Sequence, residues 1–225
     1  MSVWQIEKNH NLGIFEAGIS LVGEMEKIAS VINCSIGIFT NIGDAHDEGF
    51  ASKKEKIQEK IKLFEHAKTI IYCRDNDLVD EAFTKFPTSK LFSWSHYKKA
   101  DLQILAVDKK EKSTKITAIF KEKTFAFIIP FIDAAAIENA IHCAATMLLL
   151  DIPFKVIQKR MLLLEPVSMR LELKEGINNC TIINDSYSAD LTSLELALNF
   201  ATKRTDNKPL ILFLSDILQL SLIHI

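Results

Sequence analysis

The sequence lacks the glycine-rich loop with which many nucleotide-dependent enzymes hold phosphates. No G-x-x-x-x-G-K-[ST] pattern occurs in its 225 residues. In that loop the backbone N–H groups and the lysine cradle the phosphates. Glycine itself is scarce, and six of the seven glycines lie within the first 49 residues. Phosphate chemistry, if this chain takes part in it, is therefore expected near its start.

A strong net charge and a long apolar run are also missing. The formal net charge is −2, with acids interleaved among the lysines, so we expect no nucleic-acid partner. No uninterrupted apolar run reaches the ~20 residues that a membrane-spanning helix needs. The chain is 48% hydrophobic and 25% charged, which is typical of a globular protein with one large core or two smaller domains.

The cysteines are few and far apart. The chain has four, with no C-x-x-C pair, and each lies in an apolar context. This usage favours reduced, buried thiols rather than a disulfide framework. It is typical of a cytoplasmic protein.

Alternating apolar runs and amphipathic stretches dominate the first half. The predicted strands are 12–15, 35–40, 69–73 and 90–94, and the predicted helices between them are 23–32, 52–66 and 76–86. This alternation predicts an α/β fold with a mostly parallel sheet and right-handed crossovers, in which strand 12–15 lies beside strand 35–40. The charged run at 53–56 is interpreted as a solvated helix face, and Trp94 and Tyr97 as packing residues.

The second half begins with three segments rich in β-formers. Segments 101–107, 113–121 and 124–129 predict a small antiparallel sheet, and helices at 134–150 and 154–164 should follow. Pro166 breaks this pattern, so we place a domain boundary there. Beyond it we predict strands at 169–173, 180–184 and 208–214 and a helix at 191–201. The predicted domains are therefore 1–166 and 167–225.

The most informative stretch is T-N-I-G-D-A-H-D-E-G-F at 40–50. It leaves the carboxyl end of a predicted strand and enters a predicted helix, which is where open α/β sheets bind ligands. Its glycines allow close backbone approach, and its acids and His46 offer oxygen and imidazole ligands to a divalent metal. From the residues alone, His46 is either such a ligand or a side chain that only fills the loop.

This stretch resembles the central-domain signature of the Mur ligases, ATP-dependent enzymes that add amino acids or dipeptides to the peptidoglycan precursor. Further resemblances follow in the family's order: E-A-G at 16–18, E-N-A at 138–140, and R-L-E with D-S-Y-S-A-D between 170 and 190. The resemblance implies a central ATP-binding domain at 1–166, truncated at its amino terminus. It implies the truncated start of a Rossmann-like carboxy-terminal domain at 167–225.

The resemblance also implies a magnesium site. Glu16 and His46 match two metal-binding positions of the family. Lys60, 14 residues after His46, matches a lysine that becomes carbamylated and ligates a second Mg²⁺. His46 and Lys60 are therefore the implied catalytic residues. Read without the family, Glu16 is equally a solvated strand-end acid and Lys60 an exposed helix lysine.

Three further positions are implied to contact ATP. Asn139 matches an asparagine that hydrogen-bonds adenine, and an amide can both donate to and accept from that base. Arg170 matches a residue on the phosphates and Asp185 one on the ribose. Read alone, Asn139 is equally a capping or surface residue. His142, three residues later and predicted on the same helix face, is given a supporting role at most.

The implied reaction is amide-bond formation through an acyl phosphate. The segments look most similar to the family member whose partners are UDP-N-acetylmuramoyl-tripeptide and D-alanyl-D-alanine, including a form fused to an alanine racemase. Two alternatives stay open: another ligase of the superfamily, such as a folylpolyglutamate synthase, or a non-catalytic binding domain without the phosphate loop. Because that loop is missing from these residues, we expect this chain alone to be inactive.

Overall fold

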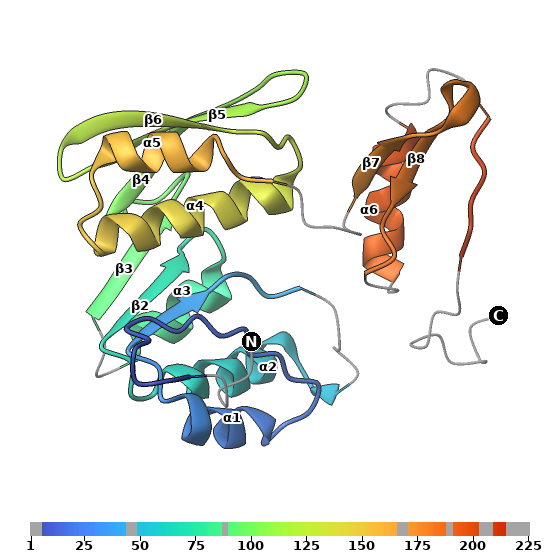
Figure 1. Cartoon of the computed structure of the whole chain (residues 1–225). Coiled ribbons are helices and arrows are strands. Elements are labelled where there is room, and N and C mark those ends of the chain that lie inside the picture. The colour runs from blue at the N-terminus through green and yellow to red at the C-terminus, as the bar shows by residue number, and fades with distance from the viewer. Residues whose placement is uncertain are drawn as a thin grey trace. The chain divides into compact units, whose positions relative to one another are not determined.

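The computed structural model describes residues 6–43, 49–86, 90–165, 171–187, 191–202 and 209–214. The chain divides into two compact units, residues 1–164 and 165–225, and each is described by itself (Figure 1). The boundary predicted after residue 166 lies close to this division. Which domain each unit represents stays a prediction.

A six-stranded sheet forms the centre of the first unit. Its strands, in the order in which they are hydrogen-bonded, are β1 (Ile36–Phe39), β2 (Thr69–Cys73), β3 (Lys90–Ser95), β4 (Leu102–Lys109), β5 (Thr114–Phe120) and β6 (Lys123–Ile129). Strands β1 to β4 pair in parallel, and β4 to β6 pair antiparallel. The predicted α/β class is confirmed, and the three antiparallel strands continue the parallel sheet.

Helices cover both faces of this sheet. The helices are α1 (Glu24–Ile32), α2 (Lys53–Ile61), α3 (Asp77–Thr84), α4 (Ala134–Leu149) and α5 (Phe154–Met161), with a 3₁₀ turn, η3, at Lys62–Phe64. Successive strand residues point to opposite faces. Ile70 accordingly packs with α2 and α3, whereas Ile71 packs with α4 and α5. No helix in the described ranges is long and apolar enough to cross a membrane.

Local capping residues begin three of these helices. The Ser52 hydroxyl oxygen accepts a hydrogen bond from the Glu55 N–H, while the Glu55 carboxylate accepts from the Ala51 N–H. Asn76 and Asp133 cap α3 and α4 in the same way. These starts follow from local hydrogen-bonding chemistry, because each cap satisfies backbone donors that a helix leaves open.

Helix α1 is capped from a distance. Its N-cap residue, Gly23, has a positive φ of 87° and no side chain. The carboxylate of Glu59 on α2 instead accepts from the backbone N–H groups of Gly23 and Met25, at 2.7 and 3.2 Å. Burial alone would raise the pKa of Glu59, but Lys62 and these two N–H groups hold it below its usual value. Glu59 therefore ties α1 to α2.

The strand predicted at 12–15 does not form. Leu12 and Ile14 are 66% and 79% exposed, and the segment has no strand geometry. An apolar run becomes a strand only where a partner backbone completes its hydrogen bonds. Among the described residues β1 pairs with β2 alone, so the predicted pairing of 12–15 with 35–40 is wrong.

Several predictions of burial are also wrong. Lys56, predicted on a solvated helix face, is only 2% exposed. Tyr97 is exposed, so the packing role holds for the buried Trp94 alone. The four cysteines are free, as predicted, but Cys143 and Cys180 are exposed, and the other two, Cys34 and Cys73, are half-buried.

The second unit contains a small antiparallel sheet and one helix. Strands β7 (Glu172–Glu175) and β8 (Thr181–Asn184) pair antiparallel, and helix α6 spans Leu191–Thr202. The strand predicted at 208–214 is wrong for the described part, 209–214, which has no strand geometry. Phe213 there is largely exposed. The cause is the same as at 12–15, since this apolar run meets no partner backbone within the described ranges.

Candidate functional site

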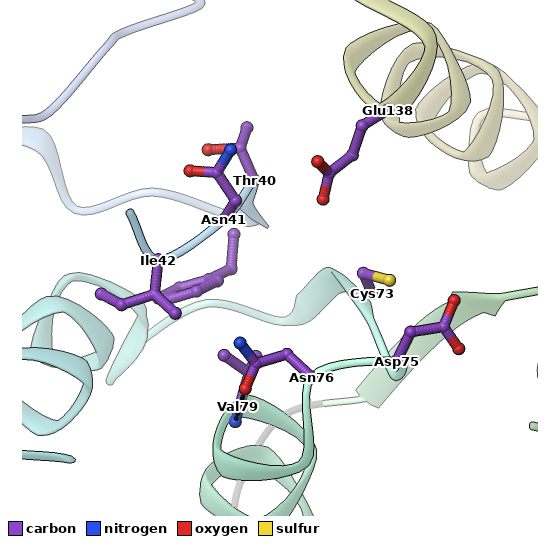
Figure 2. A pocket seen from close by; sticks show the side chains of 9 residues that line it. Thr40, Asn41, Ile42, Cys73, Asp75, Asn76, Val79 and Glu138 are labelled. Carbon is purple, nitrogen blue, oxygen red and sulfur yellow. Dashed lines mark hydrogen bonds between the residues drawn. The ribbon is translucent and has the colours of Figure 1, made fainter. Parts of the chain in front are cut away.

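A pocket of about 290 Å³ opens at the carboxyl ends of β1 and β2. Figure 2 shows that side chains from the end of β1, the end of β2, α3 and α4 converge there. The lining residues are Phe39, Thr40, Asn41, Ile42, Cys73, Asp75, Asn76, Val79 and Glu138. The loop singled out in the sequence therefore begins in this pocket, at the sheet edge where α/β proteins bind ligands.

Three side chains that line the pocket, Asp75, Glu138 and Cys73, lie in different surroundings. The Asp75 carboxylate accepts from the Ser95 hydroxyl and, at 2.8 Å, from the His96 N–H, so it holds the connection between β3 and β4. Glu138 points from α4 into the pocket (Figure 2). Burial, and then the charge of Asp75, raises the pKa of Glu138. Burial also raises the pKa of Cys73 to about 12, so this thiol stays protonated at neutral pH and is no nucleophile.

His142 joins the root of the loop to the core. It is 3% exposed, and its Nδ1 lies 3.1 Å from the Trp94 Nε1 while its Nε2 lies 2.9 Å from the Thr40 carbonyl oxygen. An indole N–H only donates, so Nδ1 accepts and Nε2–H donates to Thr40. Burial lowers the pKa of His142 to about 4, and the ring is neutral.

His142 and Asn139 do not share a helix face, contrary to the prediction. Asn139 is exposed, whereas His142 is buried between α4 and the sheet. The sequence signal for this role was a single histidine among the apolar residues of 140–145. That signal could have indicated a buried polar contact, but not its partners.

Lys56 contacts the same loop on both sides of residues 44–48. Its Nζ donates to the Gly43 carbonyl at 2.7 Å and lies 6.0 Å from the centre of the Phe50 ring. Burying an ammonium group is costly unless polar partners replace water. The hydrogen bond to the loop therefore offsets part of the cost of burying this lysine.

The structure describes two of the three residues that are predicted to bind metal. Glu16 is exposed on a segment without helix or strand, and Lys60 is half-buried in the last turn of α2. His46 lies outside the described residues. Ser20 lies further along the segment that carries Glu16. Gly49 approaches Ser20 so closely that a Cβ atom on Gly49 would lie 1.9 Å from the Ser20 carbonyl oxygen. Within the described ranges, no group of three or more His, Cys, Asp or Glu side chains is placed to hold a metal.

Lys60 has an unusual electrostatic environment for a helix lysine. Burial, and then the neighbouring charge of Lys56, lowers its pKa. A lowered pKa enlarges the fraction of neutral amine, which is the reactive form of lysine. The expectation of an ordinary exposed lysine is therefore wrong at this position.

The predicted ATP contacts lie in different places. Asn139 is exposed on α4, next to the pocket residue Glu138. Asp185 belongs to the second unit, where its carboxylate accepts from the Leu171 N–H at 2.9 Å. Arg170 lies outside the described residues.

Comparison with models of protein families assigns this chain to a family. The model of the Mur ligase middle domain matches residues 3–147. The chain belongs to the Mur ligase family. The match includes the pocket, α2 with Lys60, and most of α4 with Asn139 and His142.

Two of the relatives with similar sequences share one name. The chain is 26% identical over 223 residues to the UDP-N-acetylmuramoyl-tripeptide–D-alanyl-D-alanine ligase of Bacillus subtilis, covering 98% of this chain and 48% of that protein. It is also 26% identical to the ligase of the same name from Borreliella burgdorferi, covering 86% and 41%. The chain thus spans about half the length of these Mur ligases.

Solved structures show the same fold. A MurF structure from Acinetobacter baumannii superposes with a TM-score of 0.76 at 19% identity, over 88% of this chain and 44% of that one. The MurF ligase of Thermotoga maritima, solved in complex with ADP, gives a TM-score of 0.63 at 16% identity, over 80% and 42%. At these identities the likeness concerns the Mur ligase fold alone.

Proposed function

We propose that this chain is the nucleotide-binding part of an ATP-dependent ligase that adds D-alanyl-D-alanine to UDP-N-acetylmuramoyl-tripeptide. The observation that carries the proposal is the position of the loop 40–50, which starts in a pocket at the carboxyl edge of a Mur ligase sheet. The name shared by the relatives from Bacillus subtilis and Borreliella burgdorferi supports the choice of acceptor. A cytoplasmic location follows from the proposed substrates.

The proposed reaction has two steps. The tripeptide carboxylate attacks the γ-phosphorus of ATP, forming an acyl phosphate and releasing ADP. The amine of D-alanyl-D-alanine then attacks the acyl carbon, an amide bond forms and inorganic phosphate leaves. Phosphoryl transfer of this kind depends mainly on positioning and on electrostatic stabilisation.

Three residues would hold magnesium: Glu16, His46 and a carbamylated Lys60. A carboxylate, an imidazole and a carbamate offer the oxygen and nitrogen donors that suit a divalent cation. Glu59, next to Lys60 on α2, accepts a hydrogen bond from the Gly23 N–H, and Gly49 lies against Ser20 on the segment that carries Glu16. When bound, the metal would neutralise phosphate charge.

Three further residues would contact ATP. Asn139 would read the adenine edge, because an amide offers both a donor and an acceptor. Arg170 would pair with the phosphates, for which a guanidinium is well suited, and Asp185 would accept from a ribose hydroxyl. Glu138 and Asn41 would line the neighbouring pocket.

The experiment that tests the function is an ADP-release assay. We expect no D-alanyl-D-alanine-dependent ADP release from the 225-residue chain alone, since these residues contain no G-x-x-x-x-G-K-[ST] loop. Any longer product of the same reading frame that includes such a loop should release ADP only when UDP-N-acetylmuramoyl-tripeptide, D-alanyl-D-alanine and Mg²⁺ are all present. Release with a folate and glutamate instead would favour a folylpolyglutamate synthase. Release with neither set would leave a binding domain as the better account.

Lys60 should carry a carbamate. With ¹³C-bicarbonate at neutral pH, we expect a carbamate ¹³C resonance, because the buried amine has a larger neutral fraction than a solvated lysine. Lys60→Arg should remove the resonance, since a guanidinium does not deprotonate in proteins. Lys54→Arg, an exposed position on the same helix, is the matched control and should keep it. A resonance that survives Lys60→Arg would contradict the assignment.

A further inference from the structure

We propose that the backbone at residues 40–43 is positioned by two side chains outside the loop, His142 and Lys56. This inference deepens the proposed function and rests on it for its consequence, namely the binding of nucleotide. Its geometry stands on contacts within the first unit alone. Neither residue was predicted to act on the loop.

The first anchor is the His142 ring on the Thr40 carbonyl. The ring is buried, and its Nδ1 is occupied by the Trp94 indole at 3.1 Å. The remaining nitrogen, Nε2, faces the Thr40 oxygen at 2.9 Å. Because Trp94 can only donate, the ring has one tautomer compatible with both contacts. The core of α4 and β3 therefore fixes the point at which the loop leaves β1.

The second anchor is the Lys56 ammonium on the Gly43 carbonyl. It approaches from α2, on the face of the sheet opposite α4, and donates at 2.7 Å. A charge-assisted hydrogen bond of this kind is roughly twice as strong as a neutral one. Lys56 also faces the Phe50 ring. It therefore contacts the chain just before and just after residues 44–48.

Asn41 and Ile42 lie between the two anchored carbonyls, and both line the pocket. Two fixed carbonyl groups on either side of the three residues 41–43 leave little freedom for their backbone. The anchors therefore determine where the Asn41 amide and the Ile42 side chain enter the pocket (Figure 2). His142 and Lys56 are positioning residues, because neither lines the pocket itself.

Two variants of His142 separate its two contacts. His142→Asn places an amide near the position of Nδ1, where it can still meet Trp94 but is too short to reach Thr40. His142→Gln places an amide N–H near the position of Nε2, where it can still donate to Thr40. Lys56→Met removes the donor to Gly43, and Lys56→Arg retains one. Lys54→Met is the control for loss of a lysine from α2.

The first readout is the backbone order parameter of each amide in the 225-residue chain, measured by ¹⁵N relaxation. We expect the order parameters of Asn41, Ile42 and Gly43 to fall from about 0.85, the value of a rigid backbone, to below about 0.6 in His142→Asn and Lys56→Met. They should stay near the wild-type values in His142→Gln, Lys56→Arg and Lys54→Met. The amide of Ile116, in the centre of β5, reports general loosening of the fold. A fall confined to 41–43 supports the proposal, whereas unchanged or uniformly lower order parameters overturn it.

The second readout is the affinity for Mg·ATP, measured by calorimetry. His142→Asn and Lys56→Met should weaken it about 10-fold or more, the usual effect of losing a residue that orients a binding group. His142→Gln and Lys56→Arg should retain it. Failure of the wild-type chain to bind Mg·ATP would count against nucleotide binding by this chain, while the order parameters would still decide whether the two anchors hold the loop.

Discussion

Replacing Phe83 by alanine is expected to lower the free energy of unfolding by about 3–5 kcal/mol, the usual range for a fully buried phenylalanine. Its side chain is 0% exposed, and its ring centre lies 4.9 Å from that of Tyr72 and 5.3 Å from that of Phe39. Phe83 thus fills the space between α3 and the first two strands. A close-packed interior collapses only partly around such a cavity.

Phe86→Ala is the matched control for this variant. Phe86 meets the same ring at 6.2 Å but is only half-buried at the margin of the core. Its truncation should therefore cost less than half as much free energy. Urea denaturation followed by circular dichroism measures both variants. Equal losses would show that Phe83 is not the centre of this core.

The same core explains how the pocket is supported. Phe39 packs on Phe83 and directly precedes Thr40, where the loop begins. Phe39 and Val79 line the pocket, and both belong to this cluster. Loss of the Phe83 ring should therefore loosen the pocket wall as well as the domain, and Mg·ATP affinity should fall together with stability.

Much of the first unit could be predicted from the sequence because its signals are local. The apolar runs that became β1 and β2, and the alternation along β5, are read within a few residues. The caps at Ser52, Asn76 and Asp133 likewise depend on neighbours three residues away. Such signals survive in any tertiary context that buries the correct face.

The errors arose where a partner distant in the sequence decides the outcome. The runs at 12–15 and 209–214 are as apolar as true strands, but no neighbouring backbone pairs with them in the described part of the chain. The sequence predicts a solvated Lys56 because its acceptor, Gly43, lies 13 residues away. Glu59 was overlooked because the helix that it caps lies 36 residues away. Burial of a polar side chain is set by such partners and not by its helix.

The candidate site was found partly by resemblance and partly by topology. The rule that ligands bind at the carboxyl edge of a parallel sheet placed the loop correctly, and the pocket lies there. The pocket residues Asp75, Asn76 and Glu138 were not predicted, because two segments distant in the sequence, the connection between β2 and α3 and the helix α4, bring them together. For Glu16, Lys60 and Asn139 the sequence indicated the chemistry but not the exposure of each side chain.

His142 should make the first unit sensitive to acid within a defined pH range. Burial lowers its pKa from 6.5 to about 4, so between these values the unfolded chain binds a proton that the folded chain does not. The stability that neutral His142 contributes is therefore fully present above pH 6.5 and is lost as the pH falls toward about 4. Below about pH 4 this contribution no longer changes with pH. At about 1.4 kcal/mol for each unit of pKa, the total loss is about 3 kcal/mol.

His142→Gln isolates this contribution. Glutamine cannot take up a proton, so the difference in unfolding free energy between the wild type and the variant should shrink or reverse as the pH falls from 6.5 to about 4. Carboxylates with lowered pKa values, such as Asp80 beside Arg74 and Lys98, also lose stability in acid. Their effect is common to both proteins and cancels in the difference. Urea titrations at half-unit steps of pH measure the unfolding free energy of both proteins. If the two curves of unfolding free energy against pH are parallel, His142 takes up a proton in the folded state as readily as in the unfolded chain. The ring would then not be locked between Trp94 and Thr40 in its neutral form, and the first anchor of the loop would lose its physical basis.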